Sequence, residues 1–149
     1  MSILQRLFGR KEKEPPLPPL NDSTFGELHW NDDSDGWVGY VSCQNGKVDV
    51  YLGSGSAQAY PSNEVLELLR EPYARFQEFT ATALAYLQAS DKPKVWEVNP
   101  ETFVVAGLES YEHYVKTGTY TITFTAGDSG AIWRVNFENA KPTGCGVDD

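Results

Sequence analysis

The chain is poor in cysteine and histidine, with two of each among its 149 residues. Cys43 and Cys145 lie far apart and belong to no CxxC pair, so the sequence predicts no disulfide framework. Long apolar runs are lacking as well, because no segment approaches the roughly 20 apolar residues of a membrane-spanning helix. The first residues, MSILQRLFGRKEK, contain no apolar stretch of signal-peptide length before their charges. We therefore expect a cytoplasmic protein with both thiols reduced.

Positive charge is also scarce, because the chain has 12 lysines and arginines and 21 aspartates and glutamates. Residues 1–14 carry four cations against two acids, so residues 15–149 carry eight cations against 19 acids, a net charge of −11. Such an acidic body repels phosphate backbones, which argues against nucleic-acid binding. It attracts a basic protein partner, although the same charge also serves simple solubility.

The N-terminal region, residues 1–23, is expected to be a flexible tail. Ile3, Leu4, Leu7 and Phe8 would share one side of a short helix, which is marginal in water by itself. The proline-rich stretch at 15–19 is typical of a polyproline spacer. One alternative function follows from this tail, a peripheral membrane adaptor that uses the apolar residues as its anchor.

Short segments of alternating polarity predict two antiparallel meanders of three strands each. Their expected ranges are 25–30, 37–43, 48–52, 108–115, 118–125 and 130–137. Asn45-Gly46 is the strongest short signal for a two-residue hairpin turn. In the second meander Tyr120, Ile122 and Phe124 face one way and four alternating threonines face the other. This pattern is typical of a sheet with one buried face.

Between the meanders, residues 61–89 show the helical spacing of apolar side chains that would face a sheet. Pro72 lies inside this run and predicts a kink or a split, because its ring clashes with the preceding turn. The order of elements predicts an α+β fold, in which the antiparallel sheet packs on one long, proline-kinked helix. We expect a single domain over residues 24–141, followed by a short acidic C-terminal tail at 142–149.

Three short motifs resemble functional sites but are better explained as turns or loops. Gly127-Asp128-Ser129-Gly130 has the letters of a serine-protease nucleophile, yet the chain is too short for two β-barrels. The acidic segment at 31–36 imitates a calcium loop, but Ser42 stands where a bidentate glutamate is required. The Gly-Ser loop at 53–56 lacks the lysine of a phosphate loop. The sequence therefore predicts no metal and no cofactor.

His29 and His113 are the histidines available for acid–base chemistry. Each lies in a predicted strand without an evident partner, and in a regular strand Glu112 and His113 point to opposite faces. The leading interpretation is therefore a binding protein that is not an enzyme. A small hydrolase whose site gathers His29, His113 and Glu112 is the alternative.

The acidic turn before the second strand is the predicted contact surface. Asp32, Asp33 and Asp35 would steer a basic partner, and Trp37 would supply an aromatic anchor. The four tryptophans as a group are nevertheless expected to lie mostly in the core. The predicted partner is an unidentified protein of basic character.

Several short motifs together resemble a set of small bacterial domains, most of them of unknown function. The motifs are Phe25-Gly26-Glu27-Leu28, Trp37-Val38-Gly39, Pro61 before the long helix, and Asn99-Pro100-Glu101. The likeness spans residues 24–141, and some members of the set are suspected immunity proteins of polymorphic-toxin systems. The resemblance implies no functional residue, because the motifs mark strand geometry. It adds a basic toxin to the partners that the sequence suggests.

Overall fold

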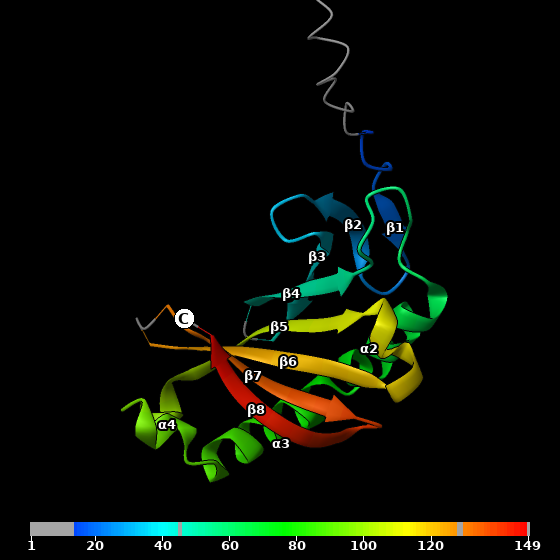
Figure 1. Cartoon of the computed structure of the whole chain (residues 1–149). Helices are drawn as coiled ribbons and strands as arrows, with labels where there is room; N and C mark the ends of the chain where they lie inside the picture. Colours follow the sequence, from blue (N-terminus) through cyan, green and yellow to red (C-terminus); the bar gives the residue numbers. More distant parts are fainter. Residues whose placement is uncertain (1–13, 45, 128–129, 149) are drawn as a thin grey trace, which may run out of the picture.

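Eight strands form one sheet in the computed structural model of the protein, which describes residues 14–44, 46–127 and 130–148 (Figure 1). The strands follow the chain in order from β1 at one edge to β8 at the other. They are β1 Leu20–Asp22, β2 Gly26–Asn31, β3 Gly36–Cys43, β4 Gly46–Gly53, β5 Phe103–Tyr111, β6 Thr119–Ala126, β7 Ile132–Glu138 and β8 Lys141–Asp148. Every neighbouring pair is antiparallel except β4 and β5, which run parallel.

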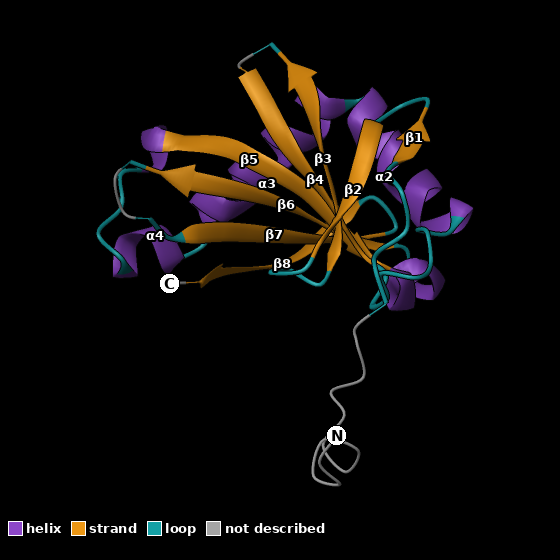
Figure 2. Ribbon diagram, turned by 90° about the horizontal axis from the view of Figure 1, so that it is seen from above, coloured by secondary structure: helices purple, strands orange, loops and turns teal. Residues whose placement is uncertain are grey.

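The helices form the crossover that a parallel pair of strands requires. After β4 the chain forms α2 (Asn63–Ala74), α3 (Phe76–Ala89), the short α4 (Lys92–Val95) and the 3₁₀ helix η1 (Pro100–Thr102) before β5 begins. Both long helices lie on the same face of the sheet (Figure 2). We call the opposite face the open face, because no α-helix of the described residues crosses it.

The predicted α+β character is confirmed, but the sheet is larger than two three-stranded meanders. It consists of two four-stranded meanders that meet at the parallel β4–β5 pair. The sequence missed β1, which lies in the region predicted as an N-terminal tail, and β8, which covers the predicted acidic C-terminal tail. Glycine and proline give β8 a low strand propensity, and its ladder to β7 overrides that propensity.

The single long helix expected over 61–89 is in fact two helices. The helical backbone is interrupted at Arg75, where φ is −113° and ψ is 37°, whereas Pro72 lies within α2. Ser62 begins α2 as an N-cap, and its Oγ accepts a hydrogen bond from the Val65 N–H at 3.2 Å. Beyond the interruption the ladder resumes, with the Phe79 N–H donating to the Arg75 carbonyl.

The core fills the space between the two long helices and the sheet. Phe79 of α3 packs edge-on against Tyr120 and Phe137, with ring centroids 6.1 and 5.8 Å apart. Trp37 and Trp133 are completely buried, as expected of core tryptophans, but Trp96 is 43% exposed. Tyr120, Ile122 and Phe124 belong to this core, as predicted, but Thr121 and Thr123 on the other face of β6 are buried as well, with 7% and 3% exposure.

The described part of the predicted N-terminal tail packs against the domain. The Leu17 N–H donates to the Ala57 carbonyl at 2.9 Å, and the Gln58 side-chain amide donates to the carbonyls of Glu14 and Pro15. Residues 1–13, which include the apolar residues of the predicted membrane anchor, lie outside the described residues. Of the helices in the described part of the chain, none is long and apolar enough to cross a membrane.

Candidate functional site

Polar side chains line up in rows across the open face, because alternation along each strand turns them away from α2 and α3. In the first row, strand pairing places four residues of β4 to β7 side by side: Tyr51, Glu109, Thr121 and Asn136. The next row, one pleat away, consists of Asp49, Gly107, Thr123 and Arg134. Because neighbouring strands lie about 4.8 Å apart, the residues of each row adjoin one another. Gly107, Thr121 and Thr123 are themselves buried between their neighbours.

Glu109 is the boundary between two grooves in this surface. The first has a volume of about 330 Å³ and reaches toward the turn between β2 and β3. We call it the acidic groove, and its lining includes Ser34, Tyr40, Asp49, Tyr51 and Glu109. The second has a volume of about 430 Å³ and reaches toward β8. We call it the mixed groove, and its lining includes Glu109, Tyr111, His113, Tyr114, Thr121, Arg134 and Asn136.

Two glycines make room for tyrosine rings on the open face. A Cβ atom at Gly36 would lie 2.3 Å from the Tyr51 ring, and one at Gly53 would lie 2.2 Å from the Tyr111 ring. The Tyr51 hydroxyl donates to the Ser34 carbonyl at 2.7 Å, and the two rings meet edge to face with centroids 5.5 Å apart. The rings therefore lie across the neighbouring strands in fixed positions.

Glu109 has the most unusual environment on this face. Burial raises the pKa of its carboxyl, the Arg134 guanidinium lowers it, and the Asp49 carboxylate raises it again, with a net upward shift. Within the described residues the carboxylate accepts no hydrogen bond and forms no ion pair. Arg134 is instead paired with Asp148. A half-buried acid without a partner is a candidate for ligand binding, because buried polar groups in proteins normally have one.

Replacing Glu109 by glutamine is expected to stabilise the protein at neutral pH. Since the fold raises the pKa of this carboxyl, its ionised form is less favourable in the folded protein than in the unfolded chain. Stability is therefore lost as the pH rises from the ordinary value of 4.5 through the folded pKa. We expect a higher urea midpoint for Glu109→Gln at pH 7 and equal midpoints below the ordinary value. Exposed Glu97 provides the control substitution, and an equal or lower midpoint for Glu109→Gln at pH 7 would contradict the prediction.

Of the four predicted contact residues, the three aspartates are exposed and the tryptophan is buried. Asp32, Asp33 and Asp35 are exposed in the turn between β2 and β3, where the Asn31 Oδ1 accepts the Asp33 N–H at 2.9 Å. Trp37, however, is 0% exposed, and its indole N–H donates to the Ala59 carbonyl at 2.9 Å. The prediction that Trp37 is an exposed anchor is therefore wrong.

Tyr40 is the exposed aromatic residue that sequence reasoning missed. It lies on the open face of β3, opposite Asp49 of β4, and is 56% exposed. The signal was present in the sequence, because Trp37 and Val41 share the apolar face of an alternating strand. A residue three positions after Trp37 must then point to the other face.

The acidic turn and the acidic groove adjoin each other. Ser34 of the turn lines the groove and accepts the hydrogen bond from Tyr51. Burial raises the pKa of the Tyr51 hydroxyl, and Tyr111 and the carboxylates of Glu109 and Asp35 raise it further. Asp35, a predicted contact residue, and Glu109, which the sequence did not single out, thus both raise the pKa of the same tyrosine.

The structure does not bring together the three residues of the alternative hydrolase site, His29, His113 and Glu112. Glu112 and His113 lie in the 3₁₀ helix η2 (Glu112–Thr117), which replaces the end of a predicted strand. Both Glu112 carboxylate oxygens accept hydrogen bonds from Ser62, one from its N–H and one from its hydroxyl, each at 2.7 Å. His113 packs against Tyr114, with ring centroids 4.1 Å apart. His29 lies on β2, where it pairs with Val38 of β3. Glu112 therefore serves the start of α2 and is not oriented toward a histidine.

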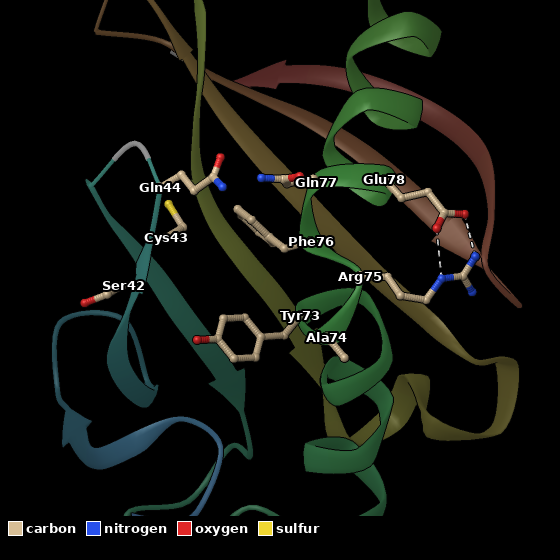
Figure 3. A pocket seen from close by; sticks show the side chains of 9 residues that line it. All are labelled: Ser42, Cys43, Gln44, Tyr73, Ala74, Arg75, Phe76, Gln77 and Glu78. Carbon is tan, nitrogen blue, oxygen red and sulfur yellow. Dashed lines mark hydrogen bonds and ion pairs between the residues drawn. The ribbon is translucent and has the colours of Figure 1, made fainter.

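A further concavity, of about 480 Å³, lies on the helix side of the sheet. Figure 3 shows Phe76 at the start of α3 reaching toward Cys43 and Gln44 of the β3–β4 hairpin. Arg75 at its rim is paired with Glu71 and Glu78. Asp128 and Ser129 of the protease-like motif lie outside the described residues.

No group of three or more histidine, cysteine, aspartate or glutamate side chains in the described residues is arranged to hold a metal ion. No protein-family model matches the chain, and neither a curated protein nor a solved structure is significantly similar to it. The inference of function therefore depends on the chemistry of the open face.

Proposed function

We propose that the protein is a non-enzymatic binding protein that holds a basic protein partner on its open face. The acidic groove is the observation that supports this proposal. Asp49 and Glu109 both line it, and the described residues that line it include no lysine or arginine. A groove with this charge, on a body with a net charge of −11, attracts cationic side chains and speeds the encounter with a basic partner.

Aromatic rings at the groove supply contact area that the charges alone lack. Tyr40 is exposed beside Asp49, and Tyr51 is fixed by its hydrogen bond to Ser34. Tryptophan, tyrosine and arginine are enriched in the energetic centres of protein interfaces, and a rigid tyrosine ring loses little entropy on binding. A strand-borne site is also pre-organised, which lowers the cost of association.

A toxin of a polymorphic-toxin system is the partner that we propose among basic proteins, and the protein would act as its cytoplasmic immunity protein. The likeness to small bacterial domains, some of which are suspected immunity proteins, supports this choice. The protein would neutralise such a toxin by covering its active surface. This mode of action requires no catalytic group on the open face.

Selection of peptides from a random phage-displayed library tests the proposed basic partner. We expect the wild-type protein to enrich sequences that contain lysine or arginine. Synthetic copies should bind at least about tenfold more weakly to an Asp49→Asn/Glu109→Gln double variant, which is a loss of about 1.4 kcal/mol. Their binding should also weaken as salt is added, because exposed charges are screened.

An Asp91→Asn/Glu97→Gln double variant is the matched control, because it removes the same charge next to α4 and leaves the open face intact. Its affinity for the selected peptides should equal that of the wild type at moderate salt. Enrichment of peptides without basic residues would overturn the proposal. Equal binding to the two double variants would overturn it as well.

A further inference from the structure

We infer that the mixed groove is a second ligand site and that it takes a neutral saccharide. This site goes beyond the proposed function, since it lies on the other side of Glu109 from the acidic groove. Its volume of about 430 Å³ falls within the range of small-molecule sites, which is about 300–1,000 Å³.

A free acceptor on β5 and a free donor on β7 lie on either side of Thr121 on the floor of the mixed groove. Glu109, Thr121 and Asn136 are directly paired on β5, β6 and β7. The Thr121 hydroxyl donates to the Asn136 Oδ1 at 2.9 Å, which fixes the amide so that its NH₂ group points elsewhere. Within the described residues, neither that NH₂ group nor the Glu109 carboxylate has a hydrogen-bond partner.

A ligand that satisfies this floor must both donate and accept hydrogen bonds. A hydroxyl group does both, because it carries one donor hydrogen and two acceptor lone pairs. A simple cation would satisfy only the carboxylate, and a simple anion would satisfy only the amide. A molecule with several hydroxyl groups therefore matches the row of Glu109, Thr121 and Asn136 better than either ion does.

Aromatic rings form one wall of the mixed groove. Tyr111 and Tyr114 meet edge to face with centroids 5.4 Å apart, and His113 packs on Tyr114. The ring of Tyr111 is held across Gly53, as described above. The face of an aromatic ring carries partial negative charge and attracts the weakly positive C–H groups of a sugar ring. A saccharide thus uses both the wall and the floor.

The charges of the mixed groove oppose an anionic ligand. Arg134 is paired with Asp148, and Glu109 lies in the neighbouring row. A phosphate group would meet the Glu109 carboxylate, and a strongly basic group would leave the amide donors of Asn136 without an acceptor. At the β8 end, a Cβ on Gly146 would contact nothing within 4 Å, so a bound saccharide has room to extend there.

Titration of the full chain with four disaccharides tests this inference. The probes are cellobiose, N,N′-diacetylchitobiose, maltose and lactose, and the readout is the set of backbone amide NMR signals of β5 to β8. We expect at least one probe to shift these signals with a Kd of about 1 mM or tighter. If none of the four shifts them at about 10 mM, the inference is overturned.

Asn136→Asp is the decisive variant, because it keeps the acceptor oxygen for Thr121 and exchanges the NH₂ donor group for a charged oxygen that can only accept. It should weaken saccharide binding at least about tenfold, or about 1.4 kcal/mol. Asn21→Asp on β1 adds the same charge at an exposed position away from the groove and should bind as the wild type does. Unchanged binding by Asn136→Asp would overturn the assignment.

Failure of this inference is distinguishable from failure of the proposed function. Saccharide affinity should be unchanged by the Asp49→Asn substitution, whereas the affinity for basic peptides should fall. If the signals of the mixed groove respond to the selected basic peptides and to no saccharide, the groove belongs to the protein contact. The saccharide assignment is then wrong while the proposed function stands.

Discussion

Replacing Asp22 by alanine is expected to lower the free energy of unfolding by about 2–3 kcal/mol. The Asp22 carboxylate accepts hydrogen bonds from the N–H groups of Thr24 and Phe25 at 2.8 and 3.0 Å. It also pairs with Arg70 of α2 at 2.7 Å, so one side chain ties β1 and its turn to the helix layer. The Asp22 side chain is only 6% exposed, and its removal leaves these donors without their acceptor.

The pH dependence of stability provides a second test of Asp22. Burial opposes its ionisation, but the N–H groups of Phe25 and Thr24 and the Arg70 guanidinium outweigh burial, so its pKa is lowered. An acid with a lowered pKa stabilises the fold above its ordinary value, here 3.8, and loses that contribution as the pH falls through the folded pKa. The difference between wild type and Asp22→Ala should therefore shrink in strong acid.

Urea unfolding at pH 7 and at a series of lower pH values measures both effects. Asp33→Ala is the matched control, since Asp33 is exposed in the turn between β2 and β3. Its effect should stay within about 0.5 kcal/mol. A loss for Asp22→Ala no larger than that of the control would show that the Asp22–Arg70 connection does not stabilise the protein.

Gly53→Ala is expected to destabilise the protein by about 1–3 kcal/mol, although alanine normally fits a strand better than glycine does. The new Cβ would lie 2.2 Å from the Tyr111 ring, so that ring would have to move. Its neighbours Tyr51 and Tyr114 hinder the movement, with ring centroids 5.5 and 5.4 Å from that of Tyr111. The loss is measured by thermal or urea unfolding.

Gly144→Ala on β8 is the control for this prediction, because a Cβ there would contact nothing within 4 Å. It should be neutral or slightly stabilising. A double-mutant cycle with Tyr111→Ala separates the steric clash from backbone effects. If Gly53→Ala costs as much in the Tyr111→Ala background as in the wild type, the close approach of ring and glycine is not the cause.

Six of the eight strands were predictable from sequence, because alternation is a local signal. In β6, for example, Tyr120, Ile122 and Phe124 identify the buried face without knowledge of any partner strand. β8 gave no such signal, since its glycines and proline carry little side-chain pattern and its pairing with β7 holds it in place. The end of α2 was also misplaced, because a helix can continue past Pro72 when the next residues keep helical dihedral angles.

The candidate site was only partly predictable, for a different reason. The acidic turn stands out as a run of aspartates, whereas Glu109 is one glutamate in an ordinary strand. Its burial and the upward shift of its pKa arise from Asp49, Arg134 and the side chains around it, which come from other strands. No local pattern reports such an arrangement. Trp37 is not a contact residue, because it shares the buried face of β3 with Val41.

The parallel pairing of β4 with β5 has a consequence for when the acidic groove comes into existence. Asp49 pairs with Gly107, so this ladder joins positions 49 and 107 across the whole helical crossover. Closing so long a loop is entropically unfavourable until the ladder forms, whereas each four-stranded half is made of contacts near in the chain. Neither half alone contains both carboxylates of the groove. A partly assembled molecule therefore lacks the acidic groove, and under the proposed function a basic partner would find its complete site only on the finished fold.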